Sequence, residues 1–128
     1  MENEKGSLSR KADRTPDVSD FGQLCWHVNA TLVPGTNMTL GEVTIDAGFA
    51  NPLHRHDNCE ELLYLIEGAL EHRIGDDTFV MAPGDVIRVP VGVPHDGRNI
   101  GDVPARMVVA YNSPERAFEV VPEPAGDA

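Results

Sequence analysis

The stretch that decides the fold runs from Gly48 to Gly68 and reads GFANPLHRHDNCEELLYLIEG. His54 and His56 lie two residues apart, and side chains at positions i and i+2 project from the same face of an extended strand. Glu61 stands at the head of an apolar run, where strand alternation places it on the same side as Leu63. Two imidazoles and a carboxylate that converge on one point are a ligand set for a divalent transition metal with open positions.

A second stretch supplies a third imidazole. It runs from Gly84 to Asn99 and reads GDVIRVPVGVPHDGRN, so that His95 follows a strand-like run and a turn rich in Pro and Gly. Any one of the three histidines, taken alone, is better explained as a surface or capping residue. Three histidines and a carboxylate, each at the end of a strand-like run, favour a shared site.

Both stretches resemble the two sequence motifs of the cupins. The first motif is Gly, five residues, His-x-His, three or four residues, Glu, six residues and Gly, and it is filled by Gly48, His54, His56, Glu61 and Gly68. The second is Gly, five residues, Pro-x-Gly, two residues, His, three residues and Asn, and it is filled by Gly84, Pro90, Gly92, His95 and Asn99. The motifs cover residues 48–99, and flanking strands extend the resemblance to about residues 35–120.

The resemblance implies an all-β fold, a small jelly-roll barrel of the kind also called a double-stranded β-helix. It implies one divalent transition metal, held by His54, His56, Glu61 and His95. Glu60 is the nearest rival to Glu61, but only Glu61 keeps the six-residue gap to Gly68. Nitrogen and oxygen ligands suit Fe, Mn, Ni, Co or Zn and do not choose among them.

Length and composition describe one acidic domain. The 128 residues can bury one core but not two, and no run approaches the roughly 18 apolar residues of a membrane span. The polar N-terminus lacks the apolar centre of a signal peptide, and Cys25 and Cys59 make no disulfide framework, so we expect a cytoplasmic protein. A net charge of −11 argues against nucleic acid and anionic membranes as partners.

Alternating apolar and polar residues predict short strands separated by Gly/Pro turns, with no convincing helix. We expect strands over residues 24–28, 38–47, 62–66, 69–74, 78–81, 86–89 and 105–111. This series favours a sandwich or barrel independently of the family. The division that we expect is a disordered or loosely ordered arm over residues 1–20, the barrel over residues 21–121 and a tail over residues 122–128.

The strand over residues 62–66 is apolar on both faces, which predicts a central strand whose outer side is also covered. A partner subunit is one possible cover. The resemblance to small cupins, which are commonly dimers, implies a homodimer, and this strand allows it. Tyr64 lies opposite to Glu61 in strand parity and is interpreted as core packing. Met38, Met81 and Met107 are likewise interpreted as core residues.

Two further side chains are candidates for a catalytic role beside the metal. His72 shares its strand face with apolar residues and should point inward, either as a hydrogen-bonded core residue or as an acid/base or substrate contact. Arg88 interrupts an apolar strand; an outward, solvated side chain is favoured, but facing inward it could bind a substrate carboxylate. His27, Trp26 and Cys59 are expected mainly as packing or loop residues.

The leading functional hypothesis is an enzyme that acts on a small oxygenated organic molecule. Within it, a metal-dependent dioxygenase, an oxidoreductase, is favoured over a redox-neutral lyase, isomerase or cyclase that uses the metal as a Lewis acid. A non-catalytic metal- or ligand-binding barrel is the second hypothesis. A sugar-binding or sugar-isomerising protein ranks lower, because the strand faces are mostly apolar. Fold and ligand set alone do not choose among these functions.

Overall fold

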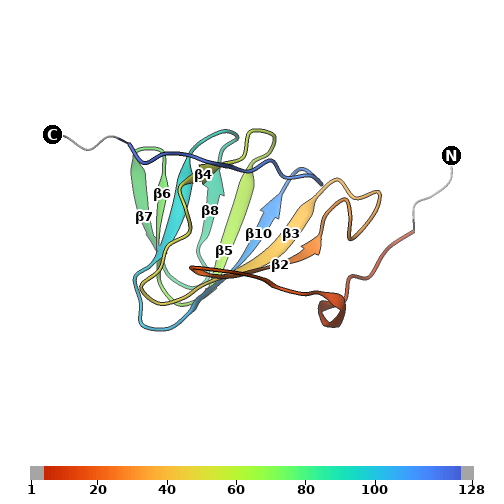
Figure 1. Cartoon of the computed structure of the whole chain (residues 1–128), viewed down its shortest axis with the longest axis horizontal. Helices are drawn as coiled ribbons and strands as arrows, with labels where there is room; N and C mark the ends of the chain where they lie inside the picture. Colours follow the sequence, from red (N-terminus) through yellow and green to blue (C-terminus); the bar gives the residue numbers. More distant parts are fainter. Residues whose placement is uncertain (1–4, 125–128) are drawn as a thin grey trace.

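Two antiparallel sheets form the protein in the structure, a computed structural model that describes residues 5–124. The larger sheet has the order β1 (Asp17–Ser19), β2 (Gly22–Val28), β3 (Thr39–Ile45), β10 (Ala105–Tyr111), β5 (Glu61–Glu67) and β8 (Val86–Val89). The smaller has the order β11 (Glu119–Val120), β4 (His54–Arg55), β9 (His95–Asn99), β6 (Leu70–Ile74) and β7 (Asp77–Met81). Figure 1 shows the strands curving from β7 and β6 through β8 and β5 to β3 and β2. The predicted all-β jelly-roll barrel is confirmed.

Helix is nearly absent from the described part of the chain. Within residues 5–124 the helical segment is one 3-10 turn, η1 (Lys11–Asp13), in agreement with the sequence. No helix in this range has the length and hydropathy needed to cross a membrane.

The core lies between the sheets and is built from alternate residues of β3, β5 and β10. Ile45, Leu65 and Met107 are almost completely buried, and their strands lie side by side in the sheet. This is the alternation that the sequence predicts for a half-buried strand. Met81 and Met107 are buried as expected.

The outer face of β5 is exposed rather than covered. Leu62, Tyr64 and Ile66 are 48%, 46% and 39% exposed. The interpretation of Tyr64 as core packing is therefore wrong: parity turns it away from Glu61, and that side of β5 is the outside of the barrel. The interpretation of Met38 as a core residue is also wrong. Met38 precedes β3 and is 52% exposed.

Short strands without hydrophobic alternation bring distant parts of the chain together. His95 is the first residue of β9, directly after the turn that the sequence predicts, and the register places it opposite His54 of β4. On its other side β9 pairs with β6, with His95 opposite Ile74. The pairing of β4 with β9 therefore fixes two of the four expected ligands side by side.

Gly68 ends β5 for a steric reason. Its φ of +94° is a left-handed conformation that glycine adopts readily. A Cβ at this position would lie 2.9 Å from the Cα of Ala105, so the backbone would have to shift. The fixed glycine at the end of the first motif is thus required by the approach of β10.

Both ends of the described chain pack against the barrel. β1 pairs with β2, with Asp17 opposite Leu24, so part of the expected arm belongs to the larger sheet. Residues 113–123, called here the C-terminal strap, run along one end of the barrel and include β11, which pairs with β4 (Figure 1). The division into arm, barrel and tail stays a prediction, and its residues 1–4 and 125–128 lie outside the described residues.

Candidate metal centre

Four side chains from separate strands meet at one buried point. His54 lies on β4, His56 just after it, Glu61 at the start of β5 and His95 at the start of β9. Their potential ligand atoms all lie within 4.8 Å of one another. All four residues are buried, with exposed fractions of 6% or less. The structure therefore brings together all four residues that the sequence singles out, and their role as ligands remains a prediction.

Backbone carbonyls fix the tautomer of all three imidazoles. The distances from Nδ1 to the carbonyl oxygen are 2.6 Å for His54 with Pro52, 2.8 Å for His56 with Ala117 and 3.0 Å for His95 with Val93. A carbonyl only accepts hydrogen bonds, so each Nδ1 carries the proton and donates it. Each Nε2 of a neutral ring therefore presents a lone pair, which is the arrangement that orients a histidine toward a metal.

The cluster needs a cation to be electrostatically stable. Oε1 of Glu61 lies 3.2 Å from Nε2 of His56 and 3.2 Å from Nε2 of His95. Within residues 5–124, Nε2 of His56 has no properly oriented hydrogen-bond partner, although it is fully buried. Lone pairs and a carboxylate facing one another out of water are unfavourable unless a proton or metal lies between them. Three imidazole nitrogens and one carboxylate oxygen suit a divalent transition metal, so these residues fit the metal that the family implies.

The protonation states favour metal binding at neutral pH. Burial by itself raises the pKa of Glu61, but the neighbouring His56 and His95 outweigh burial and hold that pKa well below its usual range. Burial, reinforced by the nearby His95, lowers the pKa of His54 to about 3. An ionised carboxylate and a neutral imidazole are the forms that coordinate metals.

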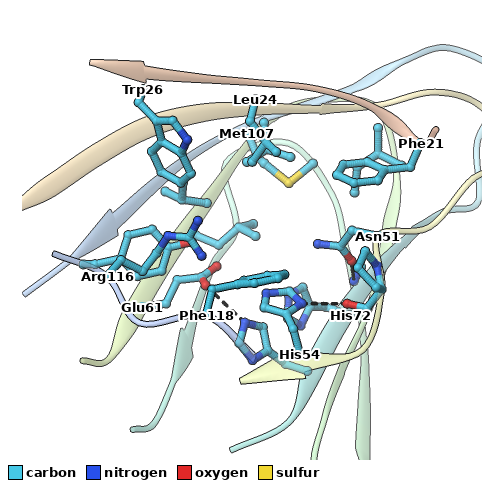
Figure 2. Close-up of a pocket in the computed structure, with 18 of the residues that line it drawn as sticks. Phe21, Leu24, Trp26, Asn51, His54, Glu61, His72, Met107, Arg116 and Phe118 are labelled. Carbon is cyan, nitrogen blue, oxygen red and sulfur yellow. Dashed lines mark hydrogen bonds and ion pairs between the residues drawn. The ribbon is translucent and has the colours of Figure 1, made fainter. Parts of the chain in front are cut away.

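A cavity of about 250 Å³ opens above the cluster. Its walls are mainly apolar and include Phe21, Leu24, Trp26, Val43, Ile45 and Met107. Asn51, His72 and Arg116 are among its few polar side chains. Figure 2 shows Leu24 and Met107 across the cavity from Glu61 and His54, with Arg116 and Asn51 on opposite sides. A small organic molecule in this cavity would contact the cluster on one side and apolar surface on the other.

His72 points into the barrel, as its strand parity predicts. It is 1% exposed, lines the cavity, and stacks on His95 with ring centroids 5.8 Å apart. Its Nδ1 has no hydrogen-bond partner among the described residues, and burial lowers its pKa to about 4. A neutral, buried imidazole beside the cluster could exchange a proton with a bound molecule.

Arg88 lies outside the site. Its side chain is 61% exposed on the outer face of β8, and its Nε donates to Glu60 at 2.7 Å. This position contradicts the hypothesis that Arg88 binds a substrate inside the barrel, because alternation along β8 turns it outward. The same ion pair shows that Glu60 faces away from the cluster, which leaves Glu61 as the carboxylate.

Arg116 is the cavity residue that the sequence did not reveal. It comes from the C-terminal strap, in a segment where no spacing or alternation distinguishes it. Trp26 also lines the cavity, although packing was the favoured interpretation. His27 pairs instead with Glu42 at 3.1 Å and does not line the cavity. The approach of the strap to β2 that defines this part of the site is not encoded in any local pattern.

A family model described as "Cupin domain" matches residues 41–111, more than half of the chain. The chain is a cupin. The expected family is thereby confirmed, and the matched range contains all four cluster residues.

Two of the curated relatives of this cupin are longer proteins. Germin-like protein subfamily 2 member 1 of Arabidopsis thaliana is 33% identical over 103 residues, which cover 73% of this chain and 46% of the plant protein. Polyketide synthase CurC of Streptomyces cyaneus is 31% identical over 93 residues, which cover 73% of this chain and 60% of CurC. The match spans about half the length of the germin-like protein and of nectarin-1 of Nicotiana langsdorffii x Nicotiana sanderae.

Solved structures confirm the fold. The formate complex of Lactobacillus farciminis oxalate decarboxylase superposes with a TM-score of 0.80 at 23% identity, covering 86% of this chain and 34% of the other. Recombinant oxalate oxidase in complex with glycolate gives a TM-score of 0.70 at 24% identity, covering 76% and 53%. At such identities the likeness shows the fold alone.

Proposed function

We propose that this cupin is a mononuclear metalloenzyme that acts on a small oxygenated organic molecule. The observation that carries the proposal is the buried meeting of three imidazoles and one carboxylate at the wall of a cavity. A divalent metal held there would polarise substrate oxygens and, if redox-active, activate dioxygen. The ligands would be His54, His56, Glu61 and His95.

The chain's own groups would prepare the site. The carbonyls that bind each Nδ1 hold the imidazoles in one orientation before any ligand arrives. The apolar walls would exclude water from a bound molecule and strengthen the electrostatic contacts around it. His72, neutral and buried beside His95, is the candidate for accepting a proton from a substrate.

Within this proposal a dioxygenase is favoured. Four protein ligands leave two positions of a six-coordinate ion for substrate and oxygen. The structural neighbours include both an oxalate oxidase and an oxalate decarboxylase, so the same fold carries oxidative and redox-neutral chemistry. A redox-neutral lyase, isomerase or cyclase is therefore the alternative, and a closed coordination shell would favour a non-catalytic barrel.

The test of the metal site is metal analysis of anaerobically purified protein. We expect about one divalent ion per chain in the wild type and almost none in His54→Ala, His56→Ala or His95→Ala. His27→Ala, on a histidine outside the cavity, is the matched control and should keep its metal. Unchanged metal content in all three cluster variants would refute the site.

The test of the reaction class is oxygen uptake by the metal-loaded protein with candidate substrates. Uptake that matches product formation supports the dioxygenase. Product formation in the absence of oxygen supports the redox-neutral alternative, and metal binding without turnover supports the non-catalytic barrel. The same measurement on His72→Gln tests the proton-transfer role, because we expect slower turnover with unchanged metal content.

We also propose a homodimer of a cytoplasmic protein. Exposed apolar side chains on β5 and the neighbouring β8, Leu62, Tyr64, Ile66 and Val86, support a second copy as the cover of this face. The free, buried Cys25 and Cys59 are compatible with a reducing compartment. Sedimentation equilibrium should give twice the chain mass, and a monomer at all concentrations would exclude this assembly.

A further inference from the structure

Arg116 lies at the side of the cavity where three aromatic rings meet. The guanidinium carbon is 4.6 Å from the ring centroid of Trp26, 5.2 Å from that of Phe118 and 5.3 Å from that of Tyr111. These distances are within the range of cation–π attraction. Figure 2 shows the guanidinium beneath Trp26 and next to Glu61 and Phe118. Aromatic faces thus hold the cation in place without using its N–H donors.

The donors of Arg116 are largely unused. Within residues 5–124 no carboxylate oxygen lies within 4.0 Å of its guanidinium, whereas Arg55, Arg73 and Arg88 each have an acidic partner. Its Nη1 lies 3.4 Å from Nδ1 of His56, but that nitrogen already donates to the carbonyl of Ala117 and cannot also accept. In a chain of net charge −11, a cavity-lining guanidinium that forms no ion pair within residues 5–124 can bind an external anion.

The rest of the cavity does not suit a second negative charge. Asp17 lines it and would repel another anion. Across the cavity from Arg116, Asn51 offers a neutral amide. Its Oδ1 accepts from the backbone N–H of Gly97 at 2.7 Å, and its NH₂ group has no hydrogen-bond partner within residues 5–124. Figure 2 shows the nitrogen of Asn51 turned toward the cavity. A ligand that suits this cavity therefore carries a single negative charge, on the side that lies next to Arg116.

The walls between these two sides are hydrocarbon. Leu24, Met107 and Phe21 face the cluster across the cavity, and Val43 and Ile45 lie on the same wall. Oxalate, for which both structural neighbours are named, has two carboxylates and no apolar part. It would leave this wall without a partner and would bring a second charge.

We propose that the substrate is a monocarboxylate with an apolar or aromatic body. Arg116 binds its carboxylate by paired hydrogen bonds, and its body lies against Leu24 and Met107. An oxygen-bearing group of that body then faces the four-residue cluster, a placement that rests on the proposed function. Arg116 is accordingly the residue that selects acids over neutral molecules of the same shape.

The experiment is titration calorimetry of the full chain loaded with zinc, with benzoate, its neutral analogue benzamide, and oxalate as probes. We expect benzoate to bind more tightly than benzamide or oxalate. Arg116→Gln removes the charge and should weaken benzoate binding at least about tenfold, while benzamide binding stays the same. Arg88→Gln, on the outer face of the barrel, is the matched control and should bind benzoate as the wild type does.

Two further measurements locate the effect. Trp26 is the only tryptophan in the chain, so a change in its emission on adding benzoate places the ligand in this cavity. Arg116→Lys keeps the charge but loses the bidentate geometry, and an affinity between those of wild type and Arg116→Gln is expected. This variant and the comparison of benzoate with benzamide test the idea even if Arg116→Gln does not fold.

Several outcomes would overturn the inference. These are equal binding of benzoate and benzamide by the wild type, no benzoate binding at all, or an Arg116→Gln variant that binds benzoate like the wild type. Failure of the proposed function would appear differently, as metal that remains bound in the cluster variants. The contact with Arg116 does not involve the cluster ligands, so each result can occur without the other.

Discussion

Each imidazole of the cluster has one nitrogen bound to the backbone and the other turned toward its neighbours. The orientation of His54, His56 and His95 therefore depends on the positions of three backbone carbonyls. His72 differs, because its Nδ1 has no partner among the described residues. A buried, uncompensated imidazole is costly to protonate, and this makes it a source of acid sensitivity.

The first prediction concerns the pH dependence of stability in the metal-free protein. The pKa of His72 is about 4 in the folded state, against an ordinary value of 6.5, so the unfolded chain binds the proton first as pH falls. The contribution of the neutral His72 to the free energy of unfolding is fully present above about pH 6.5 and is lost by about pH 4. By linkage it amounts to roughly 3 kcal/mol.

Urea unfolding between pH 7 and pH 4 measures this contribution. His72→Phe fills a similar volume and cannot be protonated, so its free energy of unfolding should fall less steeply with acid than that of the wild type. His54 is present in both proteins, and its own titration cancels in the comparison. Parallel pH profiles would mean that His72 has an ordinary pKa in the folded chain.

At the scale of the strand, sequence patterns were informative where one face of a strand is buried and the other exposed. The alternation in β3 predicts both its position and its inward residues, and the apolar runs of β5 and β10 predict the positions of these strands. β9 was not predicted as a strand, because it is short and its inward positions carry His95, Gly97 and Asn99 rather than aliphatic side chains; β4 and β11 have two residues each, too few for an alternation to define them. Pairing between distant segments, not local pattern, makes these residues strands.

The four cluster residues could be predicted from spacing because the motifs place them at strand ends. Arg116 could not, since its entry into the cavity depends on the path of the C-terminal strap. The direction of Arg88 was ambiguous in the sequence, and the register of β8 against β5 resolves it by placing it opposite the outward-facing Leu62.

The second prediction concerns Asn99, the last fixed residue of the second motif. Its Nδ2 donates to the carbonyls of Ile45 and Val103 at 2.9 and 2.8 Å, and its Oδ1 accepts from Gly101 N–H at 2.8 Å. Asn99→Ala leaves these groups without their partner and should lower the free energy of unfolding by about 2 to 4 kcal/mol.

Denaturant unfolding of the metal-free protein measures the effect of Asn99→Ala. The exposed Asn37→Ala is the control and should stay within about 0.5 kcal/mol of the wild type. Folded Asn99→Ala should still bind one metal ion, because Asn99 holds the backbone and not the ligands. Loss of metal from a folded variant would show that the motif asparagine belongs to the site itself.

At the scale of the whole molecule, the C-terminal strap is bound to the smaller sheet and to the loop that follows His56. Arg55 contacts Glu119 of the strap at 2.9 Å, and Arg73 contacts Glu123 at 2.9 Å. Nδ2 of Asn58 donates to the carbonyl of Glu115 at 2.7 Å. The strap carries the carbonyl that orients His56, and also Arg116 and Phe118 of the cavity.

The third prediction is that Asn58 affects metal affinity without being near the metal ligand atoms. The Oδ1 of Asn58 accepts a hydrogen bond from the backbone N–H of Ala117 at 2.8 Å. The carbonyl of Ala117 in turn accepts from Nδ1 of His56. Asn58→Ala should loosen that carbonyl and weaken metal binding by about tenfold. Competition with a chelator measures the affinity, with Asn37→Ala as the control; equal affinities would show that the strap holds Ala117 without Asn58.

The strap also follows all four cluster residues along the polypeptide. During translation the histidines and the glutamate therefore leave the ribosome before the carbonyl that aligns His56 has been made. A nascent chain interrupted before Ala117 would hold an ion with one imidazole free to rotate. Under the proposed function, firm metal loading would thus be a late event in biosynthesis, completed only in chains that have been elongated past this residue.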